Sequence, residues 1–101
     1  MKLQTAKNKG VRGRILRILD IDYPRWMERG LMQQTLPETG EQVSPGELAA
    51  HLTYLEEKGY LETEDRDNDI FEVTMVMLRL TPKGKDLLEG TIDADPGVQL
   101  P

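Results

Sequence analysis

Apolar residues return every three or four positions in three segments of the chain, which is the spacing of one face of an α-helix. The first segment, residues 8–21, carries the apolar set Val11, Ile15, Leu16, Ile18 and Leu19. A second helix is predicted over residues 22–34, because Asp22 can cap a helix and Pro24 suits its first turn. Trp26 lies beside the apolar face of this second helix and is expected in the core.

The third helix has the best-defined start. Ser44 is placed to cap it, Pro45 takes the first helical position, and Glu47 completes a capping box. Gly59 suits the other end, since glycine adopts a left-handed C-cap without strain. Between these ends, one face of the helix is formed by leucines, namely Leu48, Leu52 and Leu55. Because Val43 can also pack on Leu48 as a hydrophobic staple, four local signals agree on the start of this helix.

Two strands and a short helix are predicted after the third helix. Residues 60–65 and 70–80 are rich in strand-forming side chains, and the polar segment 66–69 between them is typical of a turn. Thr81, followed by a proline, can cap a short helix that Gly90 ends. The remaining residues are expected to be irregular.

The second predicted strand is apolar on both faces, because successive side chains alternate across a strand. One face carries Phe71, Val73, Met75 and Met77. The other face carries Ile70, Val76, Leu78 and Leu80. One face can cover the core, whereas the other needs the first helix, the tail or a second copy of the chain to cover it. We therefore expect a homodimer.

Two phrases of the sequence resemble a known class of protein. Residues 52–61, LTYLEEKGYL, resemble the LxxLExxGYL end of the recognition helix in bacterial regulators of the PadR, MarR and ArsR types. Residues 80–88, LTPKGKDLL, are similar to the LTxxGxxLL start of their last helix. The resemblance implies a winged helix-turn-helix over residues 9–90, which is a mostly helical α+β fold with a three-helix core, a β-hairpin wing and a short C-terminal helix. Residues 1–8 would form a basic N-terminal arm and residues 91–101 an irregular tail.

The same resemblance implies a function in transcription regulation through binding to double-stranded DNA. Residues 44–61 and the ending 88–98 are also similar to small winged-helix proteins of Mu-like phages and prophages. That second likeness implies a regulator of phage origin. Both resemblances are carried mainly by residues that shape the fold, so they specify the fold better than the function.

Charge is distributed unevenly along the chain, and this changes what the net charge implies. The formal net charge is −5, which by itself opposes binding to DNA. However, the first nineteen residues hold six cations and no acid, so the remainder holds seven cations and eighteen acids. Since charges are screened over about 10 Å at 0.1 M salt, a local basic patch can still bind phosphate. An equally simple interpretation is a solvated tail, or an arm that binds an acidic protein surface.

Candidate DNA contacts lie in three segments. The basic arm and first helix contribute Lys2, Lys7, Lys9, Arg12 and Arg14. The third helix presents Gly46, Ala50, Thr53 and Tyr54 opposite its leucine face, and the turn of the hairpin offers Arg66. The face of the third helix has no Arg, Asn or Gln for bidentate base contacts, and acids surround Arg66. Sequence readout is therefore expected to be weak, and a protein-interaction module without DNA binding is the alternative.

Enzymatic chemistry is not indicated. Cysteine is absent, and the single histidine, His51, has no nucleophile or acid placed beside it by a known motif. We expect no metal and no cofactor. No apolar run reaches the length of a membrane span and no secretion signal is evident, so a cytoplasmic protein without membrane contact is expected.

Overall fold

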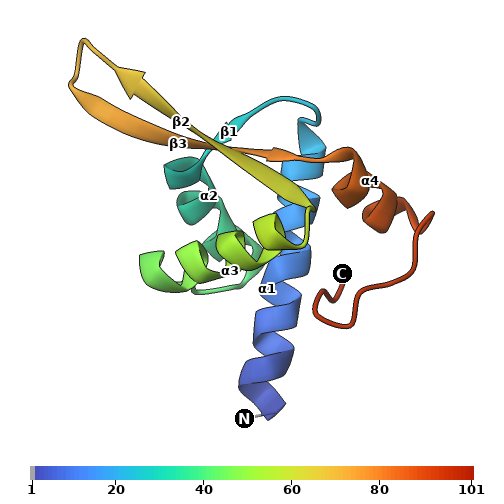
Figure 1. Ribbon diagram of the computed structural model, residues 1–101. Coiled ribbons are helices and arrows are strands. Elements are labelled where there is room, and N and C mark those ends of the chain that lie inside the picture. The colour runs from blue at the N-terminus through green and yellow to red at the C-terminus, as the bar shows by residue number, and fades with distance from the viewer. Residues whose placement is uncertain (1) are drawn as a thin grey trace.

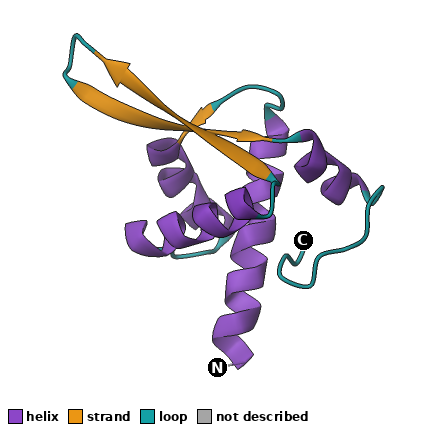
Figure 2. Cartoon of the chain, viewed as in Figure 1, coloured by secondary structure: helices purple, strands orange, loops and turns teal. Residues whose placement is uncertain are grey.

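The computed structural model describes residues 2–101, with side chains described from Leu3 onward. Helices pack beneath one face of a small twisted sheet whose hairpin projects far from the body (Figures 1 and 2). The sheet is antiparallel and its strand order is β1-β3-β2. The elements in chain order are α1 (Lys2–Ile21), β1 (Met27–Glu28), α2 (Arg29–Thr35), the 3-10 helix η1 (Leu36–Thr39), α3 (Pro45–Glu57), β2 (Leu61–Asn68), β3 (Val73–Leu80) and α4 (Pro82–Glu89).

Helix α1 begins at Lys2, so the predicted arm is helical over residues 2–8. This stretch consists largely of good helix formers and contains no proline, which explains why it continues the helix. Gly13 lies within this helix, where its missing side chain admits the C-terminal tail. A Cβ at this position would lie 1.9 Å from the carbonyl oxygen of Gln99. The expectation of a separate arm before residue 9 was therefore wrong for the described residues.

The predicted second helix was wrong over its first half. Tyr23 and Pro24 are joined by a cis peptide bond in a turn, and β1 then pairs with β3 before α2 starts. Pairing with a distant strand overrides the local helix signal, and Glu28 caps the short α2 by accepting from the Gly30 amide. Trp26 is half-buried outside the core, with its ring centroid 4.4 Å from the guanidinium carbon of Arg79.

Helix α3 confirms the local signals at both of its ends. The Ser44 hydroxyl accepts from the Glu47 amide at 3.1 Å, and the Glu47 carboxylate accepts from the Ser44 amide at 3.0 Å. Gly59 follows with a φ of 83°, the conformation that favours glycine. The three predicted leucines of this helix are all buried.

The wing is longer than predicted and turns later. β2 and β3 pair from Leu61–Leu80 to Asn68–Val73, so Arg66 lies within β2 and not in the turn. The Asn68 side-chain oxygen stabilises the turn by accepting a hydrogen bond from the Ile70 amide. Across the two strands, the Thr74 hydroxyl donates a hydrogen bond to the Asp67 carboxylate. These side-chain bonds extend the hairpin through a segment whose composition suggested a loop.

The core lies between the helices and the inner face of the sheet. Leu78 and Leu80 of β3 are buried there, so theirs is the face of the strand that covers the core, whereas Ile70 belongs to the exposed tip and not to the strand. The tail is irregular, as expected, but it packs on the body through the buried Val98 and a bond from the Gln99 amide to the Lys9 carbonyl. Over the described residues, no helix is long and apolar enough to cross a bilayer.

Candidate nucleic-acid interface

The N-terminal half of α3 presents a smooth, open surface. Gly46, Ala49, Ala50 and Thr53 are all exposed along this side of the helix. No atom lies within 4 Å of the position that a Cβ on Gly46 would take. Small side chains on one helix face allow another backbone to approach closely, which a groove of DNA requires. Gly46, Ala50 and Thr53 therefore lie where the sequence placed them, on the free side of α3.

Arg12 and Tyr54, by contrast, hold the C-terminal tail. The guanidinium carbon of Arg12 lies 3.8 Å from the Tyr54 ring centroid, and its Nη1 donates to the Gly97 carbonyl at 3.1 Å. Gly97 packs so tightly that a Cβ there would lie 1.9 Å from the Tyr54 hydroxyl oxygen. The Arg12 Nε is buried and has no hydrogen-bond partner among the described residues. These two residues have structural roles that limit their availability to a partner.

The other predicted cations differ in how freely they can reach a partner. Arg14 donates to the Thr39 carbonyl at 3.0 Å and pairs with Glu41 at 3.5 Å, which ties α1 to the segment before α3. Arg66 is paired with Glu64 at 2.8 Å on the outer face of the wing. Lys7 and Lys9 are half-exposed on α1. The Lys2 side chain lies outside the described residues.

Arg29 is an additional candidate contact that the sequence interpretation missed. It is exposed at the first position of α2 and lines, with Gln33, a groove of about 460 Å³ beside Pro45 and Gly46 of α3. The predicted helix over residues 22–34 placed Arg29 in mid-helix, so its position beside the start of α3 was hidden. Glu28, which caps α2 directly before Arg29, was the sequence feature that could have indicated where this helix starts.

A polar groove of about 250 Å³ separates α1 from the start of α3. Its lining includes Gln4 and Asn8 of α1, whose side chains share a hydrogen bond of 2.9 Å, and His51 of α3. Burial, followed by the charge of Arg12, lowers the pKa of His51 and thus favours its neutral ring. Hydrogen bonds from Ser44 lower the pKa of Glu47, and the charge of Lys7 adds to this effect. Among the described residues, no group of three potential metal ligands comes together.

The arrangement defines a class of protein. A three-helix unit, a two-stranded hairpin after α3 and a short strand before α2 together form a winged helix-turn-helix, as the sequence motifs predicted. In this class, the helix equivalent to α3 enters the major groove of DNA. Over the described residues, the four α-helices and the three-stranded sheet form the mostly helical α+β fold that was expected.

Comparison with solved structures identifies a chain with a similar fold. The chain is similar to a candidate transcriptional regulator from Thermoplasma acidophilum, with 27% sequence identity and a TM-score of 0.60. The similarity covers 75% of this chain and 74% of the other. The sequence matches no protein-family model and no curated relative. At a coarse level, therefore, this chain has the fold of a transcriptional regulator.

Proposed function

We propose that this chain is a small DNA-binding transcriptional regulator that inserts the start of α3 into the major groove. The observation that carries the proposal is the open surface at Gly46, Ala50 and Thr53, with the exposed Arg29 beside it. A guanidinium at the start of α2 is well placed for a phosphate that borders the groove. Lys7 and Lys9 add positive charge along α1.

The affinity for DNA is proposed to be weak and strongly dependent on salt. Ala50 and Thr53 can meet a thymine methyl or a hydrogen-bonding base edge, but they offer no bidentate contact. Binding must then rest mainly on phosphate contacts, which release counterions and weaken as salt rises. The proposal also includes a cytoplasmic homodimer and a phage-derived role, and these two parts rest on the sequence resemblances alone.

A protein-interaction module is the second candidate function, and the wing favours it. Asp65, Asp67 and Asp69 lie on or beside the outer half of β2, where phosphates would be repelled. Arg66, the cation of this segment, is already paired with Glu64. A wing of this kind suits a protein surface better than a DNA backbone.

Salt-dependent binding to DNA is expected and separates the two functions. Fluorescence anisotropy with a labelled random-sequence duplex should show affinity falling at least about tenfold between roughly 50 and 200 mM salt. Arg29→Ala should weaken binding at low salt and reduce the slope of log affinity against log salt by about 1. Lys83→Ala removes the same charge from α4 and serves as the matched control. No binding at the lower salt concentration would favour the protein-interaction module.

A further inference from the structure

The tail after α4 turns back and lies against α1 and α3 (Figure 1). The Gln99 amide donates to the Lys9 carbonyl at 3.0 Å, and Val98 is buried. A Cβ on Gly97 would lie 1.9 Å from the Tyr54 hydroxyl oxygen and 2.9 Å from the Tyr54 Cζ. Residues 95–99 therefore form a strap that fits closely on the surface of the two helices.

Two cations near the Tyr54 ring hold the strap. The guanidinium carbon of Arg12 lies 3.8 Å from the ring centroid, and the Lys58 ammonium nitrogen lies 5.6 Å from it. Lys58 pairs with the Asp95 carboxylate at 3.3 Å, and the Arg12 Nη1 donates to the Gly97 carbonyl at 3.1 Å. A carboxylate and a carbonyl oxygen thus occupy the positions beside these cations that an anion from another molecule would take.

The strap satisfies Arg12 only in part. Among the described residues, no carboxylate pairs with its guanidinium, and its buried Nε has no hydrogen-bond partner. A buried charged donor without an acceptor costs free energy. A phosphate would supply both the missing acceptor and the missing negative charge, because its oxygens form charge-assisted hydrogen bonds with a guanidinium.

Arg12 also lies beside the proposed DNA surface. It lines the polar groove between α1 and α3 together with Ala50, which belongs to the open side of α3. Glu47 lines the same groove, but its carboxylate accepts from the Ser44 amide in the capping box. Lys58 follows the last turn of α3 and is exposed beside the strap. The cations under the strap are therefore next to the helix that is proposed to enter DNA.

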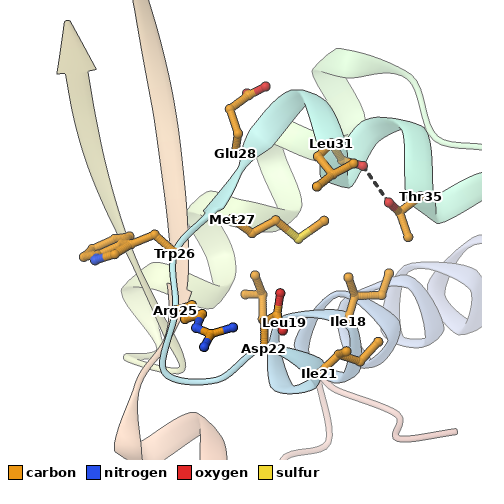
Figure 3. Close-up of a pocket in the computed structure, with 10 residues that line it drawn as sticks. All are labelled: Ile18, Leu19, Ile21, Asp22, Arg25, Trp26, Met27, Glu28, Leu31 and Thr35. Atoms are coloured by element: carbon orange, nitrogen blue, oxygen red, sulfur yellow. Dashed lines mark hydrogen bonds between the residues drawn. The ribbon is translucent and has the colours of Figure 1, made fainter.

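The apolar groove of about 280 Å³ at the other end of α1 is a poorer place for a phosphate. Figure 3 shows Met27 and Leu31 at this groove, and one cation, Arg25, lines it together with two carboxylates, Asp22 and Glu28. This lining offers an anion no net positive charge. The surface under the strap is therefore the better candidate for a further DNA contact.

We propose that the strap covers a phosphate-binding site formed by Arg12 and Lys58, and that DNA must displace the strap to use this site. The proposal rests on the proposed DNA binding and adds a means of regulating it. With the strap in place, phosphates meet the outer cations, such as Arg29 and Lys7. With the strap released, Arg12 and Lys58 each gain access to a phosphate beside the groove that α3 enters.

A change in the strap that leaves the net charge unaltered tests this competition. Gly97→Val places a side chain against Tyr54 and should release the strap, with circular dichroism to check that the fold is retained. In the anisotropy titration with the random-sequence duplex, this variant should bind at least about fivefold more tightly than the wild type at roughly 50 mM salt. The slope of log affinity against log salt should steepen by about 1 to 2, and Arg12→Ala in the Gly97→Val chain should reverse about 1 of this increase.

Asp95→Ala provides a second released chain with its own control. It removes the carboxylate that pairs with Lys58, whereas Asp93→Ala removes the same charge from an exposed position of the tail. Asp95→Ala should steepen the salt dependence and Asp93→Ala should not. In the wild type, hydrogen exchange of the Gln99 amide should speed up when the duplex is added, because this amide is bonded to Lys9 only while the strap is in place.

The outcomes separate a failure of the strap from a failure of DNA binding. If the wild type binds DNA and the released chains bind with the same affinity and salt slope, the covered site is overturned and DNA binding stands. Equal gains from Asp93→Ala and Asp95→Ala, or a Gln99 amide that stays protected in the complex, would overturn it as well. If neither the wild type nor the released chains bind at the lower salt concentration, the proposed DNA binding fails and the covered site fails with it.

Discussion

The Gly84→Ala variant is expected to lose about 3 kcal/mol of its free energy of unfolding. Gly84 is buried in the first turn of α4, where the helix packs against Tyr60 just before β2. An added Cβ would lie 2.1 Å from the Tyr60 carbonyl oxygen and 2.7 Å from Leu80 Cδ1. Because the first neighbour is backbone, α4 must move away from the sheet and expose its buried leucines. Urea denaturation followed by circular dichroism measures the loss.

Gly46→Ala is the matched control for this substitution. Gly46 is also in the first turn of a helix, but a Cβ there would meet nothing within 4 Å. Alanine should therefore stabilise the fold by about 0.5–1 kcal/mol, since glycine loses more backbone entropy on folding. If Gly84→Ala unfolded at the same urea concentration as the wild type, the close packing of α4 on Tyr60 would be contradicted.

Asp95→Ala is expected to cost about 2–3 kcal/mol and to release the tail. The buried carboxylate accepts from the Tyr60 hydroxyl at 2.6 Å and the Gly97 amide at 2.7 Å, and it pairs with Lys58 at 3.3 Å. Its removal leaves the Tyr60 hydroxyl buried without this acceptor. Urea denaturation again gives the loss, and Asp93→Ala, which removes an exposed carboxylate of the same tail, should be nearly neutral.

The Asp95 carboxylate should also make the free energy of unfolding decrease at low pH. Burial alone would raise the pKa of Asp95, but hydrogen bonds from Tyr60 and Gly97 and the charge of Lys58 outweigh burial and lower it. Burial and the Asp95 carboxylate also raise the pKa of Tyr60 to about 12. Because the pKa of Asp95 is lower in the folded chain than in the unfolded chain, its ionised carboxylate stabilises the fold at pH values above the unfolded pKa. This contribution is lost as the pH falls through the folded pKa. Asp95→Asn should therefore show a flatter decline in stability below about pH 4 than the wild type.

Features with strong local signals were predictable from the sequence. The capping box of Ser44 and Glu47 satisfies free amides within one helical turn, so its signal lies entirely in residues that are close together in the sequence. Thr81 and Gly90 likewise delimit α4 by local hydrogen bonds and backbone freedom. The exposed side of α3 followed from these boundaries, and with it the places of Gly46 and Ala50.

Features that depend on distant partners were not predictable. Met27 and Glu28 form a strand only because β3 lies beside them, and this pairing moves the start of α2 to Arg29. Arg12 resembled a free cation of a basic arm, yet the tail that it holds is 85 positions away in the sequence. The sequence shows that Arg12 carries a positive charge, but the groups that this charge contacts are determined only by the folded chain.

The ring of the single tryptophan, directly before β1, packs against the wing, and this has a practical consequence. The Trp26 ring centroid is 4.4 Å from the guanidinium carbon of Arg79 and 5.4 Å from that of Arg66. Its fluorescence will therefore respond to the electric field and solvation of the hairpin surface. The protein thus carries an intrinsic optical reporter of whatever molecule settles on its sheet, and no dye need be attached to observe that encounter.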